Sequence, residues 1–485
     1  MRRIPLERLA FPSDPKRRLE LAAFFTVLAI AAGARLVEAT RVPTWFDEIF
    51  TIWVARLGPA GIVQFLRADV HPPLHEILVW MWSRLGGESD FWLRSLSVIF
   101  GVATVAATYG IARDLFGRAP ALLAALLLAL HRTHVYYSQE VRSYALLWLL
   151  DLLAIWSAWR FTRGGGRGAM IGYVAAATAA LYTHYQSALL LATVAAWGLI
   201  TLRSSPRRLT SWIAIHLAVA VLFLPQLPTL IHQMATHQGA HWAGRPQFAD
   251  LVSLARAYAF GVSLVIVPAL ALALLPIVRR GERGAATLLW SATLPLIAIS
   301  YVLSQHDAHL FTERYMEFAL PAWCVLLAAG AIGLRWSAVA AAVSIGLAVI
   351  AALSLSRHEP LEEPRELHIA QQDLSRRAAP GDVVICADTH SLLFFMHHAP
   401  GLARYRLLEL DPRLPYYEAL GMVPDSAMIT APEFRSLRKS GARWWGVRTH
   451  HVGFDSRPGA DTLGSYATSI RHLGPLVTVI DGQPQ

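Results

Sequence analysis

The amino-acid sequence predicts a polytopic membrane protein: a mostly α-helical bundle followed by a small soluble α/β domain. Hydrophobic residues make up 55% of the chain, whereas charged residues make up only 16%. A soluble chain of 485 residues would need more charge, because its surface must face water. The apolar residues are also grouped in runs that can cross a hydrocarbon core, which takes roughly 20 residues per helix. Both observations place most of the chain in lipid.

Apolar runs of this kind recur along the chain as far as residue 356. The candidate membrane helices are residues 19–37, 73–87, 91–112, 119–135, 144–162, 169–183, 185–202, 210–231, 254–278, 285–304, 316–334 and 336–356. They predict about 11–13 transmembrane helices, of which 73–87 is especially short. The first run resembles a signal peptide, but so many runs follow it that we interpret it as an uncleaved helix.

The net charge of +10 lies largely in short basic clusters beside the apolar runs. These clusters are Arg2, Arg3, Arg8, Lys16, Arg17 and Arg18, then Arg203, Arg207 and Arg208, then Arg279, Arg280 and Arg283. Cytoplasmic loops of membrane proteins carry such an excess of basic residues. Nucleic-acid binding is not expected, because no soluble segment carries a basic stripe with aromatic residues. The two cysteines, Cys324 and Cys386, indicate neither a disulfide framework nor a metal site.

The polar connection from about 38 to 72 holds the first acidic pair beside a membrane helix, Asp47 and Glu48. Asp47 can cap the amphipathic helix that follows, with Glu48 in its first turn. Alternatively, Asp47 is a general base that removes a proton from a hydroxyl or an amine. The residues alone leave both interpretations open.

The next group is Asp69, His71 and His75, where two prolines fix the start of a helix. His71 and His75 are one helical turn apart, so a divalent metal is one alternative. A simpler role for His71 is to bind a phosphate at the helix N-terminus, where the helix dipole already favours anions.

Two further groups stand where polar segments meet apolar helices. They are Gln139, Glu140, Arg142 and Tyr144 in the first, and Glu313, Arg314 and Tyr315 in the second. Glu140 and Arg142 either pair with each other or snorkel, or Arg142 holds a phosphate through paired hydrogen bonds. His184 either faces a cavity or is a neutral packing residue between helices.

A run of histidines lies in the connection 232–253. His232, His237 and His241 are expected in an exposed loop rather than in a metal cluster.

From residue 357 helical and strand patterns alternate, which indicates an α/β domain over 357–485. The expected elements are helices near 363–378, 389–397, 431–439 and 461–472, and strands at 382–387, 404–410, 443–448 and 476–480. Pro380-Gly381 marks a turn. No phosphate-binding glycine-rich loop occurs in this sequence, so we assign the domain no chemistry.

The order of these motifs resembles one family. The Asp-Glu pair after the first helix, His-Pro-Pro-Leu at 71–74, Ser-Gln-Glu-x-Arg-x-Tyr-Ala-Leu at 138–146 and the late Arg314-Tyr315 look like the GT-C glycosyltransferases. Within that fold the sequence resembles the protein O-mannosyltransferase-like superfamily, which also holds the aminoarabinose and galacturonic acid transferases of bacterial lipid A. The resemblance implies a transferase domain over 1–356.

The resemblance also implies an activity, the transfer of a monosaccharide from a polyprenyl-phosphate donor to a hydroxyl or amine of a glycan, lipid or protein. It implies Asp47 as the general base, with Glu48 supporting it or contacting the acceptor. His71, Arg142 and Arg314 are expected around the donor phosphate. The supporting residues expected nearby are Asp69, His75, Gln139, Glu140, Tyr144, His184, Glu313 and Tyr315. Such enzymes are usually inverting and need no metal for the chemistry, so neither a metal nor another cofactor is predicted.

The aminoarabinose branch has a lysine before the two prolines, where this chain has His71. This departure makes the charge at the phosphate site depend on pH and leaves the specific sugar open.

The family also implies a topology. The protein is expected in the cytoplasmic (inner) membrane, with its site facing the periplasm or the cell exterior. Three full spans between Asp47 and Arg142 would put these two residues on opposite sides of the membrane. We therefore expect 73–87 to be re-entrant or not to cross, and by analogy we place the C-terminal domain outside.

Two other functions compete with the transferase. Buried charges also line the paths of transporters and lipid flippases, but those proteins carry paired inverted repeats, and none is evident here. The third candidate is a non-catalytic envelope assembly subunit that binds through its α/β domain.

Overall fold

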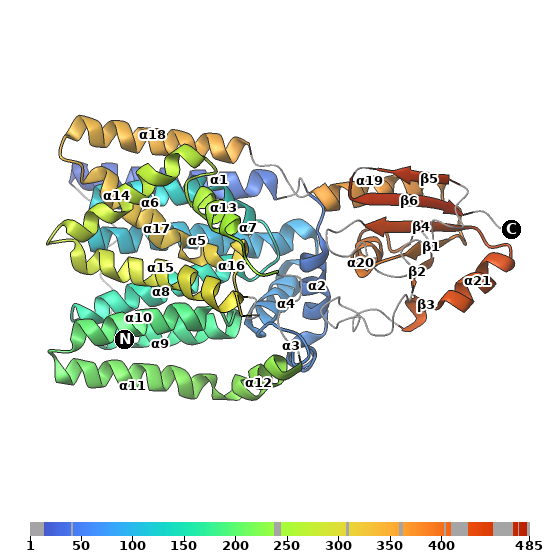
Figure 1. Cartoon of the computed structure of the whole chain (residues 1–485), viewed down its shortest axis with the longest axis horizontal. Helices are drawn as coiled ribbons and strands as arrows, with labels where there is room; N and C mark the ends of the chain where they lie inside the picture. The colour runs from blue at the N-terminus through green and yellow to red at the C-terminus, as the bar shows by residue number, and fades with distance from the viewer. Residues whose placement is uncertain are drawn as a thin grey trace.

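The chain folds into a long helical body that continues at one end into an α/β part (Figure 1). The computed structural model describes residues 14–39, 42–236, 244–306, 310–357, 362–401, 404–408, 425–449, 469–473 and 475–482. The N-terminal basic cluster Arg2, Arg3 and Arg8 lies outside the described residues, as do His237 and His241.

Seven helical segments of the described residues are long and apolar enough to cross a membrane. They are α1 (Pro15–Glu38), α5 (Asp90–Phe116), α8 (Tyr144–Thr162), α11 with α12 (Pro206–Phe223 and Leu227–Thr236), α15 (Arg283–Ser304), α16 with α17 (Glu313–Met316 and Leu320–Ile332) and α18 (Ser337–Ser356). The pair α13 (Phe248–Tyr258) and α14 (Ile266–Val278) is bent by 81° and makes an eighth if it is one span.

The other helices of the body are shorter or less apolar. They are α6 (Arg118–Leu130), α7 (Arg132–Tyr137), α9 (Gly166–Thr183) and α10 (Ser187–Leu202), with short 3₁₀ turns at Leu224–Gln226, Ser263–Val265 and Glu317–Ala319. Each run expected to be a membrane helix lies in one or two helices. Fewer of them are full-length spans than the expected 11–13, because several are short.

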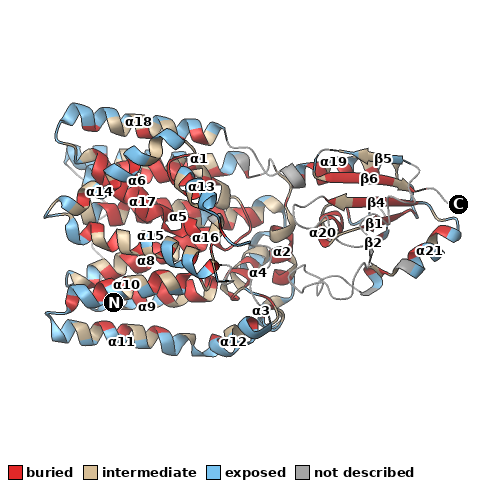
Figure 2. Ribbon diagram, viewed as in Figure 1, coloured by how far each residue is buried: buried red, intermediate tan, exposed pale blue. Residues whose placement is uncertain are grey.

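α17 is the central helix of the body, where buried residues are concentrated (Figure 2). Every residue from Leu320 to Ala331 is buried. α17 approaches α14 so closely that a Cβ atom on Gly330 would lie 1.9 Å from the carbonyl oxygen of Leu272. Only glycine allows this approach.

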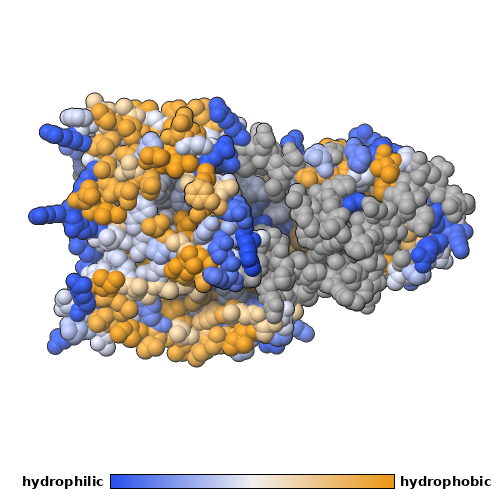
Figure 3. Space-filling model, in the orientation of Figure 1, coloured by the Kyte–Doolittle hydropathy of each residue, from blue (hydrophilic) through white to orange (hydrophobic). Residues whose placement is uncertain are grey.

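The flanks of the body are apolar, as a lipid-facing surface requires (Figure 3). Large hydrophobic side chains such as Phe25, Ile200 and Leu264 are exposed there. In a soluble protein such a surface would be costly, and in a bilayer it removes apolar area from water. The chain is therefore a multi-pass membrane protein.

Three helices lie at the end of the body that faces the α/β part: α2 (Phe46–Arg56), α3 (Gly58–Leu66) and α4 (Leu74–Gly86) (Figure 1). α4 corresponds to the short run 73–87, and it packs against α2 and α3 instead of spanning the body. Residues 73–87 are not among the described segments that are long and apolar enough to cross a membrane, and their topology stays a prediction.

The α/β part contains one six-stranded sheet with the order β3-β2-β1-β4-β6-β5. Its elements are α19 (Glu362–Arg377), β1 (Val383–Cys386), α20 (Thr389–His398), β2 (Arg404–Leu408), a 3₁₀ turn (Asp425–Ala427), β3 (Met428–Ile429), α21 (Ala431–Lys439), β4 (Trp444–Thr449), β5 (Ser469–His472) and β6 (Val477–Gly482). β1, β2, β3 and β4 pair in parallel, and β6 pairs antiparallel with both β4 and β5.

The elements expected from the sequence are present here with one correction. The helix expected near 461–472 is wrong at its C-terminal end, because Ser469–His472 forms β5, while 461–468 lies outside the described residues. Pairing with the open edge of β6 decides the conformation of this segment, since strand formation depends on neighbours more than on local pattern. The two-residue strand β3 was not predicted.

A shared apolar core joins the α/β part to the helical body. Ile49, Phe50 and Val54 of α2 belong to the same buried cluster as Leu392 and Phe395 of α20. The α/β part is thus docked on α2, directly beside the predicted acidic pair.

Candidate functional site

α2 starts with the acidic pair, and the two carboxylates have different surroundings. Glu48, at the third helical position, accepts a hydrogen bond from the backbone N–H of Trp45 (3.3 Å). A glutamate at this position commonly satisfies a free N–H group at a helix start. The cap proposed for Asp47 is thus supplied by Glu48, and the side chain of Asp47 serves another contact.

Glu48 is fully buried and holds Arg94 of α5. The guanidinium donates from Nε to Oε1 (2.8 Å) and from Nη2 to Oε2 (2.6 Å), and the backbone N–H of Val141 donates to Oε1 (2.9 Å). Arg94 also donates to the carbonyl oxygens of Ala39 and Val42, each at 2.7 Å. This ion pair therefore ties together the end of α1, the start of α2, α5 and the segment before α8.

Asp47 lies in a partly open position and pairs with Arg314. The distance from Arg314 Nη1 to Asp47 Oδ2 is 3.2 Å, and the side chains are 29% and 21% exposed. The two residues are 267 positions apart in the sequence. A partly exposed carboxylate beside a cation is a group that a substrate can reach.

Arg142 contacts the backbone of the same residue from the segment before α8. Its Nη1 donates to the backbone oxygen of Asp47 (3.2 Å) and to the hydroxyl of Thr51 (3.0 Å). Its Nη2 lies 3.4 Å from His71 Nε2. Arg142 is thus fixed by α2 on one side and by His71 on the other.

His71 is oriented by Asp69. The ring Nδ1 lies 2.9 Å from Asp69 Oδ2, so Nδ1 carries a proton and donates it to the carboxylate. The Nε2 lone pair then accepts from Arg142. Burial raises the pKa of Asp69, but its interaction with His71 outweighs burial, and the pKa falls below its ordinary value. Asp69 is therefore ionised, and the chain Asp69–His71–Arg142 fixes the guanidinium. We call Asp47, Asp69, His71, Arg142 and Arg314 the Asp47 cluster.

His184 and two tyrosines lie beside the Asp47 cluster. The His184 ring is 6.2 Å from the His71 ring and 4.8 Å from the Tyr315 ring. Burial, with the nearby His71 and Arg142, lowers the pKa of His184 to about 3, so the ring is neutral. The backbone N–H of Gln186 donates to its Nδ1 (3.1 Å), which leaves the proton on Nε2. Tyr144 packs on the same side, against Phe318.

Other expected residues lie outside the Asp47 cluster. Gln139 donates to the carbonyl oxygen of Arg35 (2.8 Å) and so holds the end of α1. His75 lies buried against Glu76, 3.7 Å away. Glu140 is buried, and burial and the charge of Glu48 raise its pKa to about 8. The side chain of Glu313 lies outside the described residues.

Two residues of the site were missed by sequence reasoning. Arg94 is a single charge inside an apolar run, a type of position that is costly unless it has a partner. That cost was a usable signal. Thr51 carries no such signal, because a threonine within an amphipathic helix is ordinary.

Comparisons with known proteins bear on the fold that holds this site. Residues 70–232 match the sequence profile of the dolichyl-phosphate-mannose-protein mannosyltransferase family. No curated protein matches the chain in sequence.

Solved structures resemble the chain over most of its length. ArnT from Cupriavidus metallidurans bound to undecaprenyl phosphate is 14% identical, with 98% of this chain and all (100%) of that chain covered and a TM-score of 0.64. The apo state of the same protein is also 14% identical, with 96% of this chain and 100% of that chain covered and a TM-score of 0.62. The Archaeoglobus fulgidus oligosaccharyltransferase tethered with an acceptor peptide is 11% identical, with 79% and 63% covered and a TM-score of 0.50. The resemblance drawn from the motifs is confirmed: this chain is a multi-pass membrane protein with the GT-C glycosyltransferase fold.

Proposed function

We propose that the protein is an inverting glycosyltransferase that moves a monosaccharide from a polyprenyl-phosphate carrier to a hydroxyl or amine of a lipid, glycan or protein. The observation that carries this proposal is the Asp47 cluster, in which the partly exposed carboxylate of Asp47 pairs with Arg314 while Arg142 donates to the backbone oxygen of the same residue. The bound undecaprenyl phosphate of the structurally similar ArnT supports the donor class.

The residues account for each step of a single displacement. The acceptor oxygen or nitrogen attacks C1 of the sugar, and the C1–oxygen bond to the phosphate breaks. Asp47 takes the acceptor's proton. The carrier leaves as a phosphate with one more negative charge than it had as a diester, so cations that face this oxygen stabilise the transition state more than the ground state.

Arg142 and Arg314 are the cations for that phosphate. In the present arrangement Arg314 is paired with Asp47, which keeps the base occupied. A donor phosphate attracts Arg314, and the carboxylate becomes free to accept a proton only when the donor is in place. This exchange suppresses unproductive proton uptake before the donor binds.

His71 acts through Arg142. Its Nε2 faces the guanidinium while Asp69 accepts the Nδ1 proton, so in this tautomer His71 orients the cation.

The position of α4 supports a site on the extracytoplasmic side. With α4 outside the membrane, and with the shorter apolar helix α6 crossing back after the span α5, Asp47 and Arg142 end on one side, as their contact requires. If the N-terminus is cytoplasmic, that side is the periplasm or the cell exterior, and the α/β part docked on α2 is outside too.

The test is a panel of radiolabelled polyprenyl-phosphate monosaccharides offered to the purified protein in proteoliposomes, with membrane lipids as acceptors. Asp47→Asn should lower sugar transfer on the order of 10²- to 10⁴-fold, the usual contribution of a general base. The matched control is Asp114→Asn, an exposed carboxylate that pairs with Arg160 far from the Asp47 cluster. Equal transfer by wild type and Asp47→Asn would remove the base assignment, and movement of intact carrier lipid without cleavage would favour a flippase.

A further inference from the structure

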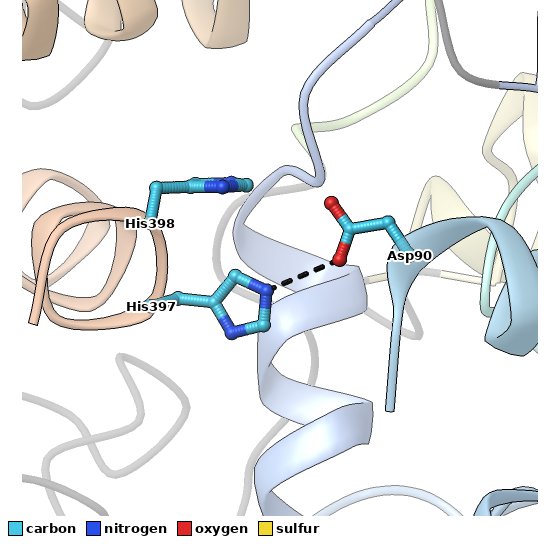
Figure 4. Close-up of side chains that lie close together, drawn as sticks. All are labelled: Asp90, His397 and His398. Atoms are coloured by element: carbon cyan, nitrogen blue, oxygen red, sulfur yellow. Dashed lines mark hydrogen bonds and ion pairs between the residues drawn. The ribbon is translucent and has the colours of Figure 1, made fainter. Parts of the chain in front are cut away.

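A second polar group lies where the α/β part meets the helical body. Asp90 is the first residue of α5, and His397 and His398 end α20. Figure 4 shows the two imidazole rings and the carboxylate directed toward one shared space. The residues come from parts of the sequence more than three hundred positions apart, since Asp90 and His397 are separated by 307. We call these three residues the Asp90 cluster.

The contacts within the Asp90 cluster are those of a preformed ligand set. One ligand atom from each residue lies within 4.8 Å of the other two. His397 Nε2 is 3.4 Å from Asp90 Oδ1. A Zn²⁺ ion needs about 2.0–2.2 Å to imidazole nitrogen and carboxylate oxygen, so small side-chain rotations bring all three atoms to one ion.

Thr44 supplies the outer contacts that orient such ligands. Its hydroxyl donates to Asp90 Oδ2, and its backbone oxygen accepts from His398 Nε2 (3.0 Å). A carbonyl only accepts, so Nε2 of His398 carries the ring proton and Nδ1 keeps a lone pair for an ion. Carbonyl and hydroxyl partners of this kind fix the tautomer and direction of ligands in metal sites.

We propose that Asp90, His397 and His398 form a binding site for a divalent transition-metal ion, with Zn²⁺ as the preferred ion. The bound ion joins the α/β part to the helical body. Two imidazoles and one carboxylate are a ligand set that zinc accepts, with a fourth position for water. Binding moves the ring proton of His397 from Nε2 to Nδ1. The Nε2 lone pair then binds the ion, and the hydrogen bond from Nε2 to Asp90 is lost. The proposal is independent of the sugar-transfer chemistry, in which the ion takes no part.

The ion would fix the start of α2. Thr44 contacts both Asp90 and His398, and it stands three residues before Asp47. Beside it, Phe46 stacks on His390 of the same helix α20, with the ring centroids 3.8 Å apart. A metal at the Asp90 cluster therefore holds α20 against the segment that carries the acidic pair.

The experiment is zinc binding by the full-length protein in detergent, after removal of metal with a chelator. Wild type should bind one Zn²⁺ per chain more than the double variant His397→Ala/His398→Ala, measured by elemental analysis after equilibrium dialysis. Substituted Co²⁺ should give a visible d–d spectrum in wild type that the double variant lacks. His390→Ala is the matched control, because it removes a histidine from the same helix and interface outside the ligand set.

A second variant guards against misfolding of the double variant. Asp90→Asn keeps the size of the side chain and should also lose the Co²⁺ spectrum. Zn²⁺ should raise the thermal midpoints of wild type and of His390→Ala, but not those of the ligand variants. Equal zinc content in wild type and both ligand variants, or a thermal midpoint of wild type that Zn²⁺ leaves unchanged, would overturn the proposal and leave the Asp90 cluster a hydrogen-bonded contact.

Discussion

Asp47 and Glu48 are neighbours in sequence, yet their ion pairs belong to different kinds of region. Glu48 and Arg94 are 0% and 5% exposed and share two short hydrogen bonds. Asp47 and Arg314 are 21% and 29% exposed and share one contact of 3.2 Å. The first pair is closed off from solvent, whereas the second is partly open to it.

This difference indicates a structural role for Glu48 and is consistent with the chemical role that we propose for Asp47. Removing a buried, fully paired carboxylate costs a large free energy, because its partner is left as an uncompensated buried charge. A partly solvated pair is weaker and exchanges its partner easily. We therefore favour Asp47 as the residue that takes the proton and Glu48 as the residue that positions Asp47. This assignment leaves the direct catalytic role, expected for both residues, to Asp47 alone.

The largest effect on folding is expected at the buried pair. Glu48→Gln leaves Arg94 charged and without a carboxylate, which should destabilise the protein by about 3–5 kcal/mol. Thermal unfolding in detergent measures the loss. Glu88→Gln is the control, because its pair with Arg56 is 44% and 46% exposed, and such pairs contribute about 0–1 kcal/mol. Equal thermal midpoints for the two variants would contradict the distinction between the regions.

The next effect concerns donor affinity. Arg142→Ala removes a charged hydrogen-bond donor from the proposed phosphate site, which is worth about 1.5–3 kcal/mol, so donor binding should weaken roughly 10- to 100-fold. Titration with a polyprenyl-phosphate sugar measures it, and Arg142→Lys should recover part of the affinity through its charge. Unchanged affinity in a folded Arg142→Ala protein would count against the phosphate role.

A smaller effect is expected from pH at Glu140, which lies between the two ion pairs. Burial and the charge of Glu48 raise its pKa to about 8 from an ordinary 4.5. Between these pH values the folded state holds a proton that the unfolded state has released, so stability should fall as pH rises through this window. Glu140→Gln removes this group, and its thermal midpoint should change less than that of wild type between about pH 5 and pH 9. Parallel pH profiles would exclude the effect.

The sequence predicted the helical body and the site to different depths. Runs of apolar residues depend on composition alone, so every expected membrane helix appears as helix. The number of full spans could not be predicted, because the length of each helix depends on breaks such as His131 and the bend between α13 and α14. The segment 469–472 became a strand because of its partner β6, which no local pattern reveals.

The candidate residues could be identified from the sequence, but their partners could not. Asp47, Arg142, Arg314, His71 and Asp69 were named from short motifs, and the structure brings them together. That Glu48 belongs to Arg94 could not be predicted, because the pairing depends on where α5 crosses α2. The Asp90 cluster was equally hidden, since its ligands come from both parts of the chain.

In the proposed mechanism Asp47 removes a proton after the donor has bound, and one measurement separates these two steps. Donor affinity and the single-turnover rate of sugar transfer would be determined together for wild type and Asp47→Asn, with one polyprenyl-phosphate sugar that wild type accepts. We predict an affinity within about threefold of wild type and a rate lowered on the order of 10²-fold or more. Transfer by Asp47→Asn at the wild-type rate would contradict the central claim.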